Sequence, residues 1–282
     1  MKTLLIITLS FALFSCNYGR KHTPAQKQAN QPLPKPAILQ QHLTYLVDSF
    51  PDKASVDSFV HRYKPEDLAS ILDFNRMDRK FLKPGKKLVV PSILFPSFAD
   101  YSTYPLELSF ADTVQKLAIV SLRNQSFAIY EYGKLVRTGP CSSGKKAAPT
   151  PAGLYHTNWR KRVKKSTIDR EWIMPWYFNI QNKAGIAFHE YEMPGFAASH
   201  ACIRLHSKDA IWIYNWGTPW QLADQGHTIV RNGTPVVLFG EYDHEHDPVW
   251  FQLPANPDAM KITDADLQQI QSFLSQRDPQ KG

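Results

Sequence analysis

Alternating hydrophobic and polar positions dominate the chain between residues 114 and 242. The turn "RNQS" is flanked by two such runs, "KLAIVSL" and "FAIYEY", and a second tight turn leads into "LVRTGP". Runs of this period joined by short turns are typical of an antiparallel meander. Strand patterns continue in "GLYHTNW", "WYFNI", "GIAFHEY" and "TPVVLFGEY", and one helix is expected at "SKDAIWIYNWG". We therefore predict a mainly β domain over residues 114–242.

Helical periodicity appears earlier, in the segment 41–94. Val56, Phe59 and Val60 recur at the spacing of one helix, and a second apolar stripe begins after Pro65, a residue that suits a first helical turn. The turn "KPG" then precedes "KKLVVP", which reads as a short strand, and "HLTYLVD" is a candidate for a strand before the helices. This pattern predicts a small α-rich unit.

The remaining segments have weaker patterns. Residues 95–113 carry aromatic residues and prolines without a clear period, so they are expected to form a connector. In the C-terminal extension, residues 243–282, Thr263 precedes Asp266 by three positions, which predicts a capping box and a helix that docks through a single apolar stripe.

The first residues predict export. Lys2 is followed by an apolar run from Leu4 to Phe14, which fits a secretory signal and is too short to span a bilayer. "LFSC", which ends at Cys16, resembles a bacterial lipobox; this resemblance implies removal of residues 1–15 and acylation of Cys16. The alternative is an ordinary signal peptide with an incidental cysteine.

The polar segment 16–40, rich in Gln, Pro and Lys, is expected to be a flexible tether behind the lipidated Cys16. The sequence thus predicts a lipid-anchored membrane protein of the cell envelope that faces the periplasm. Its formal net charge is +8. With no nucleic-acid-binding motif, we expect an anionic envelope polymer as partner rather than nucleic acid, although charge does not choose among glycan, lipid and peptide carboxylates.

The cysteines raise the question of chemistry. If Cys16 is acylated, Cys141 and Cys202 are the thiols left in an oxidising compartment, where a disulfide is an ordinary outcome. A nucleophilic cysteine needs a base and donors for an oxyanion. His189 and His200 precede Cys202, and in a strand the side chains of residues 200 and 202 would share a face. Alone, this pair favours packing or a disulfide over catalysis.

A longer pattern carries more information. "GIAFHEY" followed by "PGFAASHACIRL" resembles the signature of the L,D-transpeptidases, cysteine enzymes that cross-link peptidoglycan stem peptides. The segments "CSSGKKAAPTPAGLY", "MPWYFNI" and "GTPVVLFGEY" resemble other parts of that family, over residues 116–242 in all. The resemblance implies a mainly β, β-sandwich-like catalytic domain, with the small α-rich N-terminal unit before it and the C-terminal helix behind it.

The same resemblance implies roles for individual residues. Cys202 would be the nucleophile and His189 the general base, oriented by the carbonyl of Glu190. His200 would complete the catalytic set and shape the pocket. Arg204 would bind a stem-peptide carboxylate through its guanidinium.

Ser199 would also contact the substrate, and the backbone N–H groups of Ala201 and Cys202 would form the oxyanion hole. The family has glycine where this chain has Ala201, and alanine there would cost about 1 kcal/mol if φ were positive. The spacer between His189 and Ser199 is also short. Neither departure removes a catalytic atom.

Two further segments resemble a second family. "DLASILDFN" and "LKPGKKLVVP" resemble the later part of a lysin motif, which implies glycan binding; the alternative is a helical spacer. The expected partners are thus peptidoglycan stem peptides and glycan, with the membrane reached through Cys16. The expected reaction is acyl transfer to an amine, with hydrolysis or a lapsed, purely binding lipoprotein as alternatives. Oligomeric state stays open.

Three features remain. Cys141 is a buried thiol, a disulfide partner of Cys202, or a contributor to the site. The basic run 159–170 is a lid over the substrate or, as we favour, a solvated face. "DHEHD", residues 243–247, has metal-ligand residue types without the spacing of a zinc site, so we expect neither metal nor cofactor.

Overall fold

The computed structural model describes residues 43–166 and 171–276. The predicted signal peptide, Cys16 and the tether 16–40 therefore lie outside the described residues, as do positions 167–170 of the basic run. Within the described ranges, no helix has both the length and the apolar character needed to cross a membrane.

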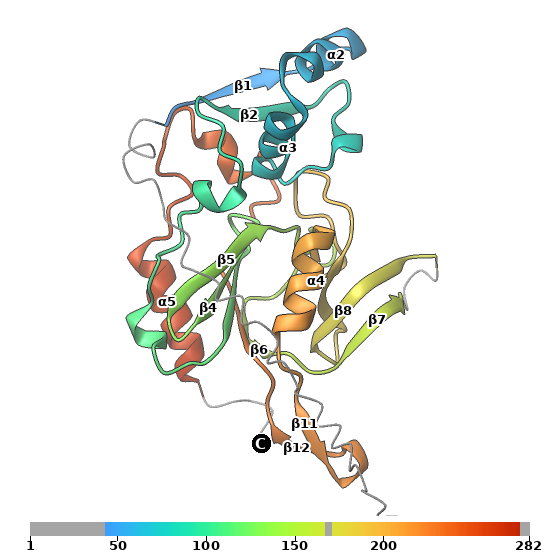
Figure 1. Ribbon diagram of the computed structural model, residues 1–282, viewed down its shortest axis with the longest axis vertical. Coiled ribbons are helices and arrows are strands. Elements are labelled where there is room, and N and C mark those ends of the chain that lie inside the picture. Colours follow the sequence, from blue (N-terminus) through green and yellow to red (C-terminus); the bar gives the residue numbers. More distant parts are fainter. Residues whose placement is uncertain (1–42, 167–170, 277–282) are drawn as a thin grey trace, which may run out of the picture. The chain divides into compact units, whose positions relative to one another are not determined.

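The N-terminal unit consists of two helices between two strands (Figure 1). In chain order its elements are β1 (Tyr45–Ser49), α2 (Lys53–Arg62), α3 (Pro65–Phe74), the 3₁₀ turn η1 (Arg79–Phe81) and β2 (Lys87–Pro91). β1 pairs antiparallel with β2, and Pro65 stands in the first turn of α3 as predicted. Phe59, Ile71 and Leu88 are fully buried between the helices and this ladder. Glycan binding by this unit stays a prediction.

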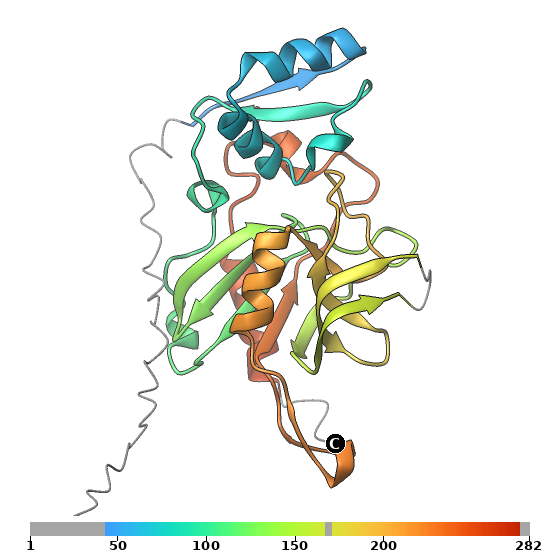
Figure 2. The same ribbon diagram turned by 45° about the vertical axis from the view of Figure 1, so that its right-hand side comes forward.

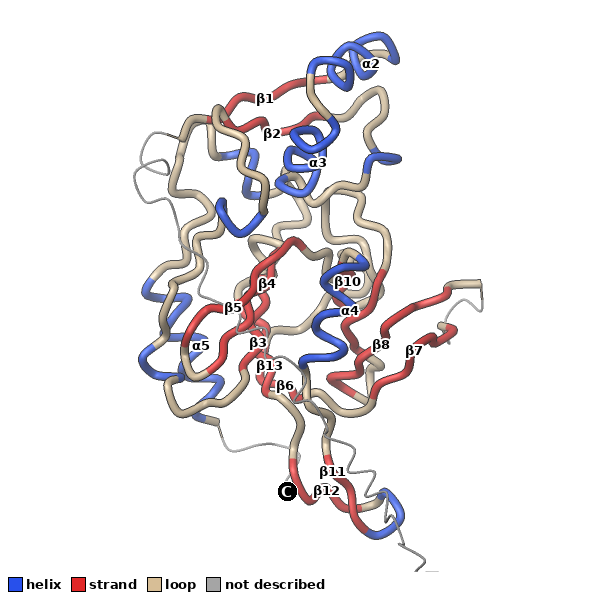
Figure 3. The backbone as a smooth tube through the Cα atoms, in the orientation of Figure 1, coloured by secondary structure: helices blue, strands red, loops and turns tan. Residues whose placement is uncertain are grey.

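The predicted β domain consists of two sheets (Figure 3). The first has the strand order β5-β4-β3-β13-β6 and the second the order β10-β9-β8-β7. The meander predicted around "RNQS" is confirmed as three antiparallel strands. The strand bounds are β3 (Leu117–Ser121), β4 (Ser126–Glu131), β5 (Lys134–Pro140), β6 (Gly153–His156), β7 (Arg160–Lys165), β8 (Ile173–Gln181), β9 (Ile186–Glu190), β10 (Ile203–Leu205) and β13 (Pro235–Phe239).

The main core lies between the two sheets. Phe127 of the first sheet and Phe178 and Phe188 of the second are all buried in it. Helix α4 (Ser207–Trp216) lies over the seam between the sheets and adds Ile213 to this core (Figures 1 and 2). The β-sandwich-like arrangement and the helix predicted at "SKDAIWIYNWG" are both confirmed.

The other face of the five-stranded sheet is covered by α5 (Asp264–Ser275) and by the segment 95–113. This segment, expected to be a plain connector, contains two 3₁₀ turns, η2 (Phe98–Tyr101) and η3 (Ser109–Ala111), and packs Tyr104 into the core. The Tyr104 hydroxyl donates to the carbonyl of Ser126 at 2.9 Å. The connector is therefore part of the domain, and its lack of period reflects an irregular backbone rather than exposure.

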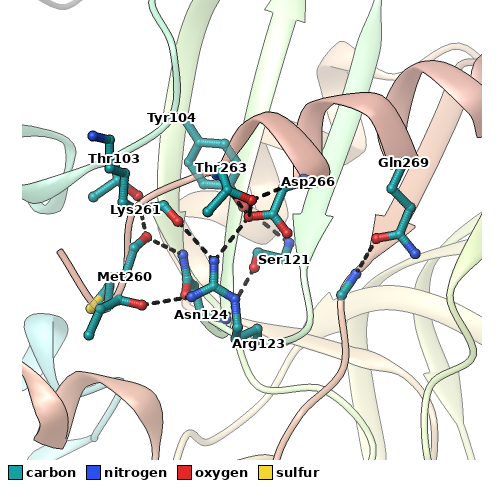
Figure 4. Close-up of polar contacts among 12 residues, drawn as sticks. Thr103, Tyr104, Ser121, Arg123, Asn124, Met260, Lys261, Thr263, Asp266 and Gln269 are labelled. Carbon is teal, nitrogen blue, oxygen red and sulfur yellow. Dashed lines mark hydrogen bonds and ion pairs between the residues drawn. The ribbon is translucent and has the colours of Figure 1, made fainter.

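Polar contacts fasten the C-terminal extension to the turn between β3 and β4 (Figure 4). The Arg123 guanidinium donates to the carbonyl of Lys261 at 2.9 Å and pairs with Asp266 at 3.1 Å, and Asn124 donates to the carbonyl of Met260 at 2.7 Å. Thr263 caps α5, and the capping box predicted with Asp266 is confirmed. The extension also carries the 3₁₀ turn η5 (Val249–Gln252).

Arg76, just after α3, joins the N-terminal unit to these segments. Its side chain is completely buried, and its Nη2 and Nε donate to the carbonyl of Asn124 at 2.9 and 3.1 Å. Its Cζ lies 4.3 Å from the ring centroid of Trp250, a residue of η5, and forms a cation–π contact with it. Burial lowers the pKa of Arg76 to about 9, so it stays charged at neutral pH. One buried cation thus links three separate parts of the chain.

Among the described residues, one strand of the second sheet and one hairpin were not predicted. Half of the basic run, Arg160–Lys165, forms β7, the edge strand of the second sheet, where exposed charges disfavour pairing with another chain. The other is the hairpin of β11 (Gln221–Ala223), the 3₁₀ turn η4 (Asp224–Gly226) and β12 (Thr228–Arg231), which extends away from both sheets (Figure 1).

Candidate active site

The outer face of the four-stranded sheet borders a cavity that collects the side chains singled out in the sequence. Arg204 enters it from β10, His189 from β9, and Cys202 from the residue before β10. The complete lining is Lys164, Ser166, Trp172, Met174, Tyr177, Ala184, Gly185, His189, Tyr191, Ser199, His200, Cys202 and Arg204. The fold thus brings His189 and Cys202, which lie thirteen positions apart in the chain, into one cavity.

The parallel pairing of β10 with β9 places these residues. Arg204 is the register partner of His189, and Ile203 that of Phe188. Because side chains alternate along strands, Ile203 and Phe188 face the core while Arg204 and His189 face the cavity. Cys202, two residues before Arg204, falls on the cavity side diagonal to His189.

The segment 199–202 is a turn, so the expectation that residues 200 and 202 share a strand face was wrong. Both side chains nevertheless line the cavity. The turn is closed by the Ser199 hydroxyl, which donates to the carbonyl of Cys202. It is held from outside by Thr150, whose hydroxyl donates to the carbonyl of Ala201 at 2.9 Å. The Ser199 side chain, predicted to contact substrate, is thus bonded within the turn.

Ala201 adopts a left-handed conformation with φ of 71°. An alanine side chain is strained there, which explains why glycine occupies this place in the signature that the sequence resembles. A left-handed residue turns successive N–H groups toward one side and forms an anion-binding nest. Neither the Ala201 nor the Cys202 N–H donates to an acceptor among the described residues.

His189 is oriented by its own neighbour. Its Nδ1 lies 2.9 Å from the carbonyl oxygen of Glu190, which can only accept, so Nδ1 carries the proton and Nε2 keeps a lone pair. Burial lowers the pKa of His189 to about 4, partly opposed by the Glu190 contact and assisted by the charge of Arg204. The ring of Tyr177 stacks at 6.3 Å. His189 is therefore a neutral base at neutral pH.

The Cys202 thiol is also neutral in this state. Its Sγ lies 3.5 Å from the carbonyl oxygen of Gly185, toward which it points its proton. Burial raises the pKa of Cys202 to about 11; the Ala187 backbone and the charges of Arg204 and Lys164 oppose this effect. A thiol with this pKa and an imidazole with a pKa near 4 are both neutral at neutral pH, so neither side chain carries a charge in this state.

Arg204 and His200 line the same cavity as the thiol. The Nη1 of Arg204 donates to the carbonyl of Glu192 at 3.1 Å, and its Cζ lies 4.6 Å from the ring centroid of Tyr191. The His200 ring is 4.8 Å from that of Trp172. Burial and nearby cationic charge, including that of Arg204, lower the pKa of His200. Both side chains remain available to a ligand on the cavity side.

Several lining residues were missed from sequence. Lys164 lies in the basic run that we assigned to a solvated face, but it is half-buried, lines the cavity and approaches the Tyr177 ring to 5.1 Å. Trp172 gave no sequence signal, because it lies in an irregular segment before β8. The charge of Lys164 next to an aromatic strand was the available hint.

Cys141 and Cys202 are both free. Cys141 is fully buried in the core between the sheets, whereas Cys202 contacts the cluster on the outer face of the second sheet. The buried-thiol alternative for Cys141 therefore describes its position, and burial raises its pKa to about 12. Of "DHEHD", His246 pairs with Asp243 at 2.8 Å, and within residues 43–166 and 171–276 no cluster of three His, Cys, Asp or Glu suits a metal ion.

Comparison with known proteins agrees with this architecture. The family model of the L,D-transpeptidase catalytic domain, YkuD, matches residues 115–238. A putative L,D-transpeptidase YkuD of Bacillus licheniformis is 26% identical over 157 residues, which cover 55% of this chain and 74% of that protein. L,D-transpeptidase 1 of Mycobacterium tuberculosis is 25% identical over 114 residues, which cover 35% of this chain and 45% of that protein.

Solved structures give weaker overall matches. An L,D-transpeptidase from Stackebrandtia nassauensis has a TM-score of 0.38 and 20% identity, covering 46% of this chain and 58% of that one. An L,D-transpeptidase from Xylanimonas cellulosilytica has a TM-score of 0.36 and 25% identity, covering 50% and 66%. This chain therefore spans less than two thirds of the length of these two.

Two sheets around a shared core define a mainly β domain, and a cysteine and a neutral histidine line one cavity on its second sheet. The family match is specific to this part of the chain. Residues 115–238 belong to the L,D-transpeptidase catalytic domain family.

The left-handed Ala201 generates a stability prediction. Ala201→Gly should raise the free energy of unfolding by about 0.5–1 kcal/mol, because relief of the Cβ strain exceeds the added entropy of the unfolded chain. The matched control is Ala198→Gly, at a half-buried alanine whose φ is not positive, where stability should fall by a similar amount. Urea denaturation of both variants measures the difference; equal destabilisation by both would contradict strain at residue 201.

The neutral pair generates a pH prediction. Since the raised pKa of Cys202, about 11, lies above the working range, the thiolate fraction should grow about tenfold per pH unit between roughly pH 5 and 9. The rate of Cys202 alkylation by iodoacetamide, followed by mass spectrometry, should rise in parallel. Buried Cys141 serves as the internal unreactive control. A rate plateau beginning near pH 5 would instead reveal a thiolate–imidazolium pair.

Proposed function

We propose that this protein is a peptidoglycan L,D-transpeptidase that transfers an acyl group from a tetrapeptide stem through a thioester on Cys202. The observation that carries the proposal is the shared cavity of Cys202 and His189, with the free Nε2 of His189 fixed by its contact with Glu190. The family assignment of residues 115–238 supports the same reaction class.

The geometry supports a sequence of steps. The Cys202 sulfur attacks the amide carbonyl between the L-centre and the terminal D-residue, while its proton passes to Nε2 of His189. The unpaired N–H groups of Ala201 and Cys202 stabilise the oxyanion. As the C–N bond breaks, His189 returns the proton to the departing amine of the D-residue. An acceptor amine then attacks the thioester, loses its proton to His189 and releases the thiol.

The charge of the cavity favours an anionic donor. Lys164 and Arg204 contribute cations to the lining, and no carboxylate side chain belongs to it among the described residues. The guanidinium of Arg204 presents donors in a fork that matches a carboxylate. Stem peptides carry free carboxylates at their termini, so their charge complements this lining.

The reaction is tested by incubating the protein with tetrapeptide-bearing muropeptides and reading the products by mass. Cross-linked dimers are expected from the native chain, and Cys202→Ala should reduce their rate at least about 10³-fold, because the covalent step is lost. Cys141→Ala, at the buried thiol, is the matched cysteine control and should retain activity. Tripeptides without dimers would assign hydrolysis, and unchanged substrate with the native protein would reject the enzymatic proposal.

We propose further that the enzyme works at the cell envelope, facing the periplasm and held by acyl groups on Cys16. The leader and the "LFSC" pattern support this location. In a bacterial host the native chain should partition into the membrane fraction, whereas Cys16→Ala should be released by loss of the lipid. Equal distribution of both chains between membrane and soluble fractions would contradict anchoring through Cys16.

A further inference from the structure

The connection between β9 and β10 lies against residues 76–78 of the N-terminal unit. Met77 forms an isolated antiparallel bridge with Pro194, and the N–H of Asp78 donates to the carbonyl of Met193 at 2.7 Å. We call residues 191–198 of this connection the active-site loop. The loop thus gains a short strand-like partner from outside the family-matched segment.

Close packing reinforces this contact. Gly195 has φ of 91°, and its N–H donates to the carbonyl of Arg76 at 2.9 Å. A Cβ built on Gly195 would lie 2.7 Å from the terminal methyl of the flexible Met77 side chain, which could shift, so glycine is favoured here mainly by the positive φ. The two segments are therefore joined by backbone hydrogen bonds and not only by exposed side chains.

The Asp78 carboxylate adds a second bond to the same place. Its Oδ2 accepts from the N–H of Met193 at 2.8 Å, and its Oδ1 lies 3.5 Å from Nδ1 of His206. Asp78 also precedes the 3₁₀ turn η1, but its side chain makes no capping bond there. The carboxylate is therefore committed to the loop and to the start of α4.

The contact continues into the cavity. Met193 follows Glu192, whose carbonyl accepts from Nη1 of Arg204 at 3.1 Å. Since the Glu192 carbonyl and the Met193 N–H belong to the same peptide group, Asp78 fixes the acceptor to which the Arg204 side chain donates. Two successive hydrogen bonds thus connect the Asp78 carboxylate of the N-terminal unit with the Arg204 guanidinium of the cavity lining.

We infer that Asp78 is a positioning residue for Arg204, and that the N-terminal unit therefore forms a working part of the substrate site. This inference rests on the proposed function, in which Arg204 binds a stem-peptide carboxylate. Cys202 and His189 are placed by the β9–β10 ladder, which Asp78 does not touch. Loss of the Asp78 bond should consequently weaken substrate binding without changing the reactivity of the thiol.

Steady-state kinetics with tetrapeptide muropeptides test this division. Asp78→Ala should raise KM about tenfold and change kcat by less than about twofold, since the interaction removed acts on bound substrate and transition state alike. The rate of Cys202 alkylation by iodoacetamide should stay at the native value. Asp78→Asn keeps an acceptor for the Met193 N–H and should restore KM to within about twofold of native.

Lys80→Ala is the matched control. It removes the exposed ion pair between Lys80 and Glu192, which joins the same two segments but leaves the backbone bonds intact. KM should be unchanged. A native KM in Asp78→Ala, a KM in Asp78→Asn as high as in Asp78→Ala, or an equal loss of kcat and alkylation rate would each overturn the inference.

A measurement without substrate separates this inference from the proposed function. Hydrogen exchange of the Met193 amide should accelerate at least about tenfold in Asp78→Ala and stay near native in Asp78→Asn and Lys80→Ala. If the native protein releases no muropeptide product while exchange follows this order, the proposed function fails and the positioning contact stands. Unchanged exchange in Asp78→Ala overturns the positioning contact, whatever the activity.

Discussion

The parallel ladder between β9 and β10 determines where the side chains of the cavity stand. A parallel pair is joined by a long connection rather than a hairpin, so the chain must leave the sheet after Glu190 and return before Ile203. The segment that returns to the sheet places Cys202 directly before β10. Its sulfur lies beside the sheet, and its N–H group makes no ladder bond among the described residues. The pairing of β9 with β10 thus positions His189, Cys202 and Arg204. It also requires an irregular connecting segment next to them.

That irregular segment needs support, because backbone groups outside a ladder must find other partners. One side is supplied by residues 142–145 of the catalytic domain, where Ser143 accepts from the N–H of Ser199 at 2.9 Å. The other side is supplied by the N-terminal unit through Asp78. Arg76 ties the same unit to the turn between β3 and β4. The site is therefore supported by two parts of the chain, and a family match confined to residues 115–238 misses one of them.

Local signals in the sequence predicted the regular elements well. Pro65 marked the start of α3, Thr263 marked the start of α5, and alternation around "RNQS" defined three strands, since each signal acts within one element. The motif around Cys202 predicted several of the residues that line the cavity, but it did not predict their geometry. The left-handed turn at Ala201, the packing of the connector and the Asp78–Met193 bond depend on contacts between distant segments. No periodicity encodes such contacts.

Burial decides the protonation states of the two central side chains of the cavity. Burial opposes charge on both partners, so the Cys202 thiol and the His189 imidazole stay neutral although cations lie close to them. In the proposed reaction, a carbonyl carbon of the donor held over the sulfur would change this balance. Negative charge then develops on the oxygen, which can face the N–H groups of residues 201 and 202, while the proton moves to a base already oriented by Glu190. In the proposed reaction the substrate itself would complete the electrostatic environment, by placing the carbonyl that accepts the sulfur next to the N–H groups that stabilise its charge.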